Sequence, residues 1–89
     1  MKHFASPKFW EHYDRLPAPI RKRADRAFEL LKRDPWHPSL RFEKKGRGWS
    51  VRVDDGYRAL AKDRPEGMVW IWIGNHDDYE RLIRSLPRT

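Results

Sequence analysis

The stretch that decides the fold is Trp49-Ser50-Val51-Arg52-Val53-Asp54-Asp55-Gly56-Tyr57-Arg58-Ala59-Leu60-Ala61, because it predicts a β-hairpin. Apolar and polar side chains alternate on both sides of Asp54-Asp55-Gly56, a sequence typical of a hairpin turn. We expect a three-residue loop with Gly56 left-handed, because a two-residue loop would mix arginines with apolar side chains on one face. In that register two pairs face each other: Val53 with Tyr57, and Arg52 with Arg58. One face of the hairpin is then apolar, and the other carries Ser50, Arg52, Arg58 and Leu60.

Strand patterns continue on both sides of this hairpin. From Ser39 the apolar period is two, because Leu40 and Phe42 alternate with charged residues. A basic, glycine-containing turn is expected at residues 44–48. Residues 68–73 are continuously apolar, which predicts a central strand with both faces covered.

Helical patterns flank the strands. Ser6 followed by Pro7 predicts the start of a first helix. A second helix carries an apolar stripe and ends at Asp34-Pro35, since a residue before proline avoids the helical region. A terminal helix from Asp77 or Asp78 carries Tyr79, Leu82, Ile83 and Leu86. Residues 1–5 are either a short strand or a loose tail.

The order of these elements predicts a single α+β domain over residues 1–89. Two N-terminal helices are expected to pack on a three- to four-stranded antiparallel sheet, and a short helix follows at the C-terminal end.

Composition narrows the classes of function. Lys and Arg number 20 and Asp and Glu 13, a formal net charge of +7 that favours nucleic acid or an acidic protein as partner. A basic surface that only keeps the domain soluble is the alternative. The absence of Cys excludes disulfides, zinc–thiolate sites and thiol catalysis, and it favours the cytoplasm. No apolar run is long enough to span a membrane. No histidine pair has metal-ligand spacing, so we expect neither metal nor other cofactor.

The predicted register sets Arg52 and Arg58 directly opposite each other. Like charges in that arrangement destabilise a sheet, so something must compensate. Either an anion bridges the two guanidinium groups, or a nearby carboxylate of Asp54, Asp55 or Glu43 pairs with them.

His76 lies between the apolar strand and the last helix, a common place for functional side chains. An imidazole there is a candidate general acid or base near neutral pH. The alternative is that His76 or Asp77 only caps the helix.

Three segments together resemble the RelE/ParE superfamily of toxin–antitoxin toxins: residues 34–40, residues 49–60 and residues 72–79. The resemblance implies a compact toxin of RelE-like fold with two N-terminal helices on a twisted antiparallel sheet, and a cognate antitoxin protein as partner. Its ribonuclease members enter the ribosome and cut mRNA without metal. The ribose 2′-OH attacks the adjacent phosphate and leaves a 2′,3′-cyclic phosphate. The sequence is therefore expected to encode an endoribonuclease that inhibits translation.

The resemblance also assigns site residues. Arg52 and Arg58 match the basic strand positions that hold the scissile phosphate, His76 matches the general acid or base, and Tyr79 matches a tyrosine that stacks on a base or assists proton transfer. Backbone contacts with RNA are expected from Lys44, Lys45 and Arg47. One departure is Ser50, which stands where ribonuclease members often have lysine.

Two other functions remain open at this point. One is a ParE-like toxin that inhibits DNA gyrase without catalysis. The other is a non-toxic basic module that binds nucleic acid or an antitoxin-like protein.

Overall fold

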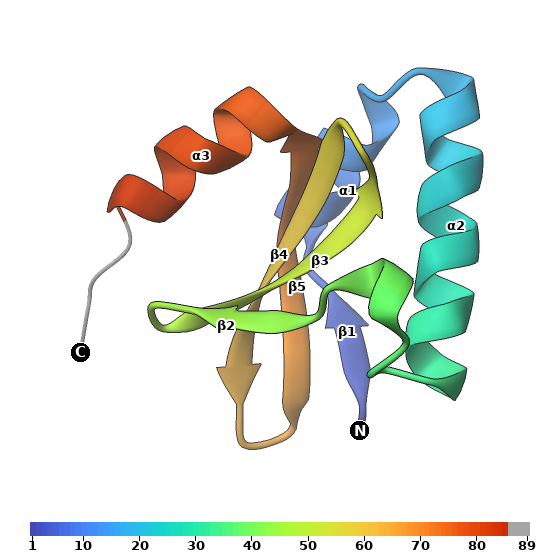
Figure 1. The fold of residues 1–89 in the computed structure, drawn as a ribbon. Coiled ribbons are helices and arrows are strands. Elements are labelled where there is room, and N and C mark those ends of the chain that lie inside the picture. Colours follow the sequence, from blue (N-terminus) through green and yellow to red (C-terminus); the bar gives the residue numbers. More distant parts are fainter. Residues whose placement is uncertain (86–89) are drawn as a thin grey trace.

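The computed structural model describes residues 1–85 and shows one sheet with helices on both of its faces (Figure 1). In chain order the elements are β1 (His3–Ala5), α1 (Pro7–Asp14), α2 (Ala18–Arg33), the 3-10 helix η1 (Pro38–Leu40), β2 (Glu43–Lys45), β3 (Gly48–Asp54), β4 (Tyr57–Arg64), β5 (Gly67–Asn75) and α3 (His76–Ser85). The predicted α+β class, with two N-terminal helices and a short last helix, is confirmed. Leu86, which was expected in that last helix, lies outside the described residues.

The sheet has five strands in the order β1-β5-β4-β3-β2. Four of them form the predicted antiparallel arrangement, and β1 adds to the outer edge of β5 in parallel. The Met68 N–H donates to the Lys2 carbonyl at 2.9 Å, and the Ser6 N–H donates to the Trp70 carbonyl at 3.0 Å. These two hydrogen bonds show that residues 3–5 form a strand and not a loose tail. The sequence left this choice open because the segment is too short to show a pattern.

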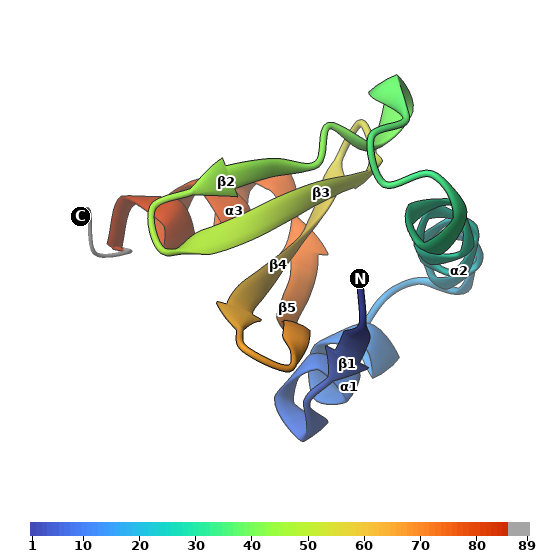
Figure 2. The same ribbon diagram turned by 90° about the horizontal axis from the view of Figure 1, so that it is seen from below.

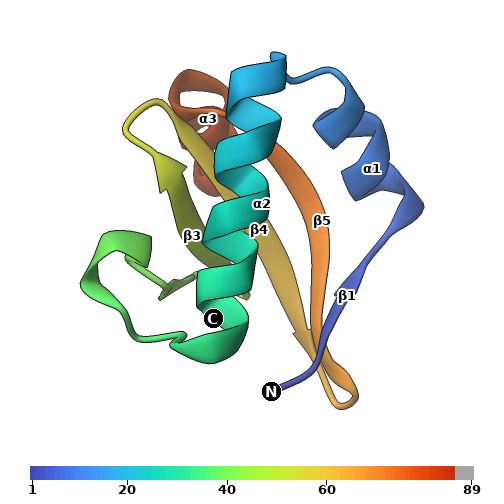
Figure 3. The ribbon, with the colours of Figure 1, turned by 90° about the vertical axis from the view of Figure 1, so that its right-hand side faces the viewer.

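The helices divide between the two faces of the sheet. Figure 3 shows α2 lying across one face with α1 beside it, and Figure 2 shows α3 behind the opposite face. The side chains between α1, α2 and the sheet form one core, whose buried members include Leu31, Leu40, Ala61, Trp70 and Ile73. No helix within residues 1–85 is long and apolar enough to cross a membrane.

Local sequence explains where the helices begin and end. Ser6 is the N-cap of α1, and its hydroxyl oxygen accepts a bond from the Phe9 N–H at 3.2 Å. α2 follows Pro17 and stops before Pro35, as predicted. α3 begins at His76, whereas the prediction placed its start at Asp77 or Asp78.

The β3–β4 hairpin has the predicted faces but a different turn. Arg52 pairs with Arg58 as expected, whereas Tyr57 pairs with Asp54 and not with Val53. A β-bulge between Arg52 and Asp54 absorbs one residue, so a two-residue turn still keeps the arginines off the apolar face. Gly56 is not left-handed, and its N–H donates to Asp54 Oδ1 at 2.8 Å. The prediction of a three-residue loop was wrong because counting alternation does not reveal a bulge.

The segment before this hairpin also differs from the prediction. Leu40 ends the 3-10 helix η1 rather than starting a strand, and Arg41 follows it with a φ of 44°. Lys44 and Lys45 belong to β2, so the expected basic turn at residues 44–48 shrinks to Gly46 and Arg47. Proline at the start of η1 and burial of Leu40 outweigh the two-residue apolar period here.

Candidate functional site

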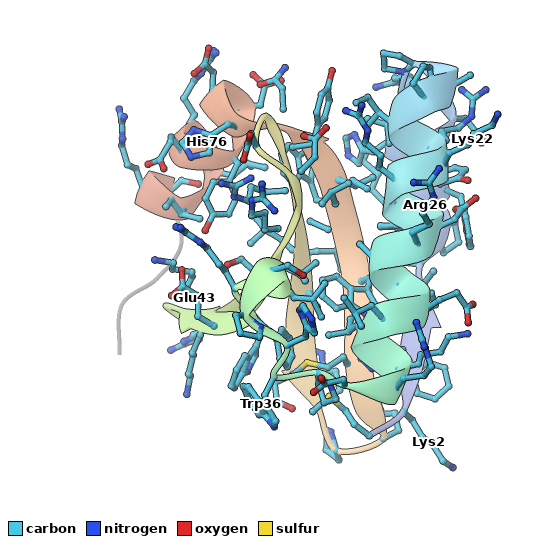
Figure 4. The ribbon with its side chains drawn as sticks, turned by 45° about the vertical axis from the view of Figure 1, so that its right-hand side comes forward. Lys2, Lys22, Arg26, Trp36, Glu43 and His76 are labelled. Carbon is cyan, nitrogen blue, oxygen red and sulfur yellow. The ribbon has the colours of Figure 1, made fainter. Side chains whose placement is uncertain are left out.

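A hollow of about 140 Å³ lies between α3 and the face of the sheet that carries Arg52 and Arg58. We call it the α3 hollow, and its lining consists of Arg41, Glu43, Lys45, Ser50, Arg52, Arg58, His76, Tyr79, Glu80 and Ile83. In Figure 4 His76 on α3 and Glu43 on β2 lie on the same side of the sheet, away from α2. The four residues predicted to act on a phosphate, Arg52, Arg58, His76 and Tyr79, are thus brought together around one space.

Arg52 reaches the hollow from β3 and is held by two oxygen acceptors. Its guanidinium contacts the Asp55 carboxylate, and Nη1 donates to the Ser39 carbonyl at 3.3 Å. The carboxylate explanation for the arginine pair therefore describes Arg52 in this structure. Asp55 is almost fully exposed, so water competes for this ion pair and it holds Arg52 weakly. The neighbouring guanidinium lowers the pKa of the Asp55 carboxyl.

Arg58 is folded back onto its own hairpin. Its Nη1 donates to the Asp54 carbonyl at 2.5 Å and to the Tyr57 carbonyl at 2.9 Å. Burial lowers the pKa of Arg58, and the positive charge of Arg52 lowers it further. An arginine remains protonated under such shifts, so the hollow keeps two adjacent cations.

His76 stands at the first position of α3, next to the hairpin turn. Its backbone N–H donates to the Gly56 carbonyl at 2.8 Å, which fixes the helix start against the turn. The ring Nε2 lies 3.4 Å from Glu80 Oε1, and the side chain is 42% exposed. The helix cap is Asn75, whose Oδ1 accepts from the Asp78 N–H at 2.8 Å. The alternative that His76 or Asp77 serves as the cap is therefore wrong. The His76 imidazole is not occupied by capping the helix.

Tyr79 is buried beside His76, one helical turn along α3. The residue is 4% exposed, and its ring centroid lies 5.8 Å from that of His76. Tyr79 is also one of the residues that line the α3 hollow.

The three predicted RNA-contacting residues separate in space. Lys45 lines the hollow and pairs with Glu43 at 3.2 Å, and this hydrogen bond raises the pKa of Lys45. Lys44 pairs in register with Trp49, so it points to the opposite face of the sheet. Arg47 lies in the turn and is not part of the lining.

Within residues 1–85 there is no group of three or more His, Cys, Asp or Glu side chains arranged to hold a metal ion. The side chains that line the α3 hollow supply cations, an imidazole, a phenol and carboxylates.

A family model described as ParE-like toxin domain matches residues 18–81, which is most of the chain. The chain belongs to this family. Its fold is that of RelE/ParE superfamily toxins. It is similar to a chain of the RelB–RelE antitoxin–toxin complex from Methanococcus jannaschii, with a TM-score of 0.68 and 13% identity over 89% of this chain and 96% of that one. It is also similar to the YoeB/ParE toxin from Agrobacterium tumefaciens, with a TM-score of 0.64 and 22% identity over 85% and 99% of the two chains. The isolated E. coli RelE toxin gives a TM-score of 0.60 and 13% identity over 94% and 97%. No curated protein gives a match to the sequence.

Sequence reasoning did not assign Arg41 or Glu80 to the α3 hollow of this toxin. Arg41 enters it because the left-handed backbone after η1 turns the chain there, a conformation that the residue type does not signal. Glu80 was detectable, since a carboxylate four residues after a histidine faces it on a helix. Ser50, which the predicted register places on the same face as the two arginines, also lines the hollow and is buried at 3% exposure.

Proposed function

We propose that this protein is the toxin of a type II toxin–antitoxin system and that it cuts mRNA on the ribosome without a metal ion. The observation that carries the proposal is the convergence of two guanidiniums, an imidazole and a buried phenol on one hollow. Transfer of a phosphoryl group needs cations on its non-bridging oxygens and groups that move two protons. The α3 hollow offers both within a single small space.

In the proposed reaction the 2′-oxygen of one ribose attacks the adjacent phosphorus. A bond forms between that oxygen and phosphorus, and the bond from phosphorus to the 5′-oxygen of the next nucleotide breaks. The 2′-hydroxyl gives up its proton and the departing 5′-oxygen receives one, which leaves a 2′,3′-cyclic phosphate and a 5′-hydroxyl. Arg52 and Arg58 hold the phosphate, His76 transfers one of the protons, and Tyr79 stacks on a base or assists the transfer.

The arginines can change partners at low cost. Arg52 exchanges an exposed carboxylate for a phosphate oxygen, which satisfies the same donors. Every hydrogen bond that Arg58 makes within residues 1–85 comes from Nη1, so its other nitrogens can reach a ligand while the backbone carbonyls hold the group in place.

The proposed partner is an antitoxin whose acidic, amphipathic segment covers basic surface of this chain. The formal charge of +7 favours such a partner, and two structures of similar fold are RelB–RelE complexes.

The test is to express the chain in cells and map the 5′ ends of mRNA. Wild type should arrest growth and produce new 5′ ends within reading frames, whereas His76→Ala combined with Arg58→Ala should do neither. Arg64→Ala is the matched control, because Arg64 is an exposed arginine at the far end of the same strand. Arrest with intact mRNA and impaired DNA supercoiling would instead identify a gyrase inhibitor, and absence of arrest would leave a non-toxic binding module.

A further inference from the structure

The α3 hollow is not the only basic hollow beside Arg52. A second one, of about 230 Å³, lies between α2 and β3, and we call it the α2 hollow. Its cations are Arg23, Arg26 and Arg52, and its apolar floor includes Ala27, Leu30 and Val53. Its lining contains no Asp or Glu. Arg52 therefore lines both hollows, which lie on the two sides of β3.

The joining point is the 3-10 helix η1. β2 pairs only with residues 48–50 of β3, so the later part of β3 has η1 as its neighbour instead of a strand. Arg52 Nη1 donates to the Ser39 carbonyl of η1, and Ser39 itself lines the α2 hollow. Figure 4 shows the two sides of this edge, with His76 on α3 on one side and Arg26 on α2 on the other.

Of the two arginines that α2 contributes to the α2 hollow, Arg23 is paired with a carboxylate and Arg26 is not. Arg23 pairs with Asp54 Oδ2 at 2.7 Å, which ties α2 to the hairpin. Arg26 is exposed and makes no hydrogen bond or ion pair with any other residue in the part of the chain that the structure describes. A polyanion at this edge thus meets one guanidinium that has no competing carboxylate.

The hairpin turn and the first turn of α3 carry the acidic residues Asp55, Asp77 and Asp78. The carboxylate of Asp54 lies on the other side, where it pairs with Arg23. A polyanion that leaves the α3 hollow is repelled by the acidic residues at the start of α3 and attracted by the guanidinium of Arg26 at the α2 hollow, which favours the route past Arg52.

We propose that the α2 hollow is a second phosphate subsite, which binds the phosphodiester next to the scissile one as RNA passes around the edge of β3. This inference rests on the proposed function. Arg26 contacts the phosphate, Arg52 is shared between the two phosphates, and the apolar floor receives the ribose or base. The contact is of the kind that positions a nucleic acid without reading its sequence.

The experiment compares two 2′-O-methyl RNA probes, which bind but are not cleaved because the attacking hydroxyl is blocked. A dinucleotide has one phosphodiester and fills only the α3 hollow, whereas a pentanucleotide can also fill the α2 hollow. Affinities are measured by NMR titration of wild type, Arg26→Gln and the control Lys2→Gln. Lys2→Gln removes one positive charge, as Arg26→Gln does, but from an exposed position at the far end of the molecule (Figure 4).

Wild type should bind the pentanucleotide more tightly than the dinucleotide. Arg26→Gln should weaken pentanucleotide binding about three- to fivefold, leave dinucleotide binding unchanged, and reduce the salt slope for the pentanucleotide by about 0.7. Lys2→Gln should match wild type with both probes. The subsite is refuted if Arg26→Gln weakens both probes equally, or if it behaves like Lys2→Gln. If wild type binds neither probe, or if Arg58→Gln leaves dinucleotide binding unchanged, the α3 hollow does not hold a phosphodiester as proposed, and the subsite is refuted with it.

Discussion

Replacement of Gly67 by alanine tests the least expected part of the fold, the parallel pairing of β1 with β5. Gly67 has a φ of 142°, and a Cβ there would lie 2.5 Å from the Lys2 carbonyl oxygen. That oxygen accepts the Met68 N–H at 2.9 Å, so the clash falls on backbone and cannot be relieved by rotating a side chain. Strained backbone costs about 1–3 kcal/mol, and loss of one backbone hydrogen bond costs about 1 kcal/mol more.

The expected loss of unfolding free energy is therefore about 2–4 kcal/mol, which corresponds to a fall in Tm of about 10–20 °C for a domain of this size. Urea denaturation followed by circular dichroism measures the first quantity, and calorimetry the second. Gly56→Ala is the matched control, because a Cβ there meets only Asp54 Oδ1 at 3.9 Å and should change stability by no more than about 0.5 kcal/mol. Equal stability of the two variants would refute the β1 pairing. Hydrogen exchange at the Met68 amide adds a local measure, since this amide should lose protection in Gly67→Ala alone.

Three further predictions concern single side chains. Asp55→Asn removes the carboxylate that competes with phosphate for Arg52, so RNA should bind more tightly, and unchanged affinity in a titration would contradict that competition. Glu80→Gln should slow RNA cleavage about tenfold while RNA affinity stays the same, because Glu80 orients the His76 ring; a parallel loss of affinity would point to a structural role. Stability should fall as pH decreases below 6.5, because burial lowers the pKa of His3 and its Nδ1 must stay unprotonated to accept the Trp70 indole N–H at 3.0 Å. Urea unfolding at pH 7 and pH 5 should show this loss in wild type and a smaller one in His3→Gln.

The sequence predicts the two sides of the sheet better than its turns. Alternation around the hairpin places Arg52 opposite Arg58 because burial of one face fixes the register. The same alternation predicts that Val53 faces Tyr57, which is wrong because Tyr57 pairs with Asp54. A bulge changes which residues pair without interrupting the alternation that the sequence shows. Residues 1–5 are too few to show a period, so the pairing of β1 is decided by the free edge of β5 and not by its own residues.

The candidate site shows the same limit. Arg52, Arg58, His76 and Tyr79 share a space because the hairpin register and the helix start fix them, and both are readable from residue order. Arg41 enters the site through a left-handed backbone after η1, which depends on tertiary packing of Leu40. Lys44 leaves the site for a simpler reason: it belongs to a strand, where neighbouring side chains point to opposite faces.

The bulge at Val53 links the core to the proposed chemistry. It lets a two-residue turn set Tyr57 against the core while Arg58 faces α3. Without the extra residue, one strand of the hairpin would slip by one position relative to its partner, and the arginine would exchange faces with its neighbours. A buried guanidinium would then replace an apolar side chain in the core, at a cost that a small domain cannot absorb. The arrangement that places both arginines in the α3 hollow is therefore the one that the core itself requires, which explains how so short a chain can hold two like charges opposite each other.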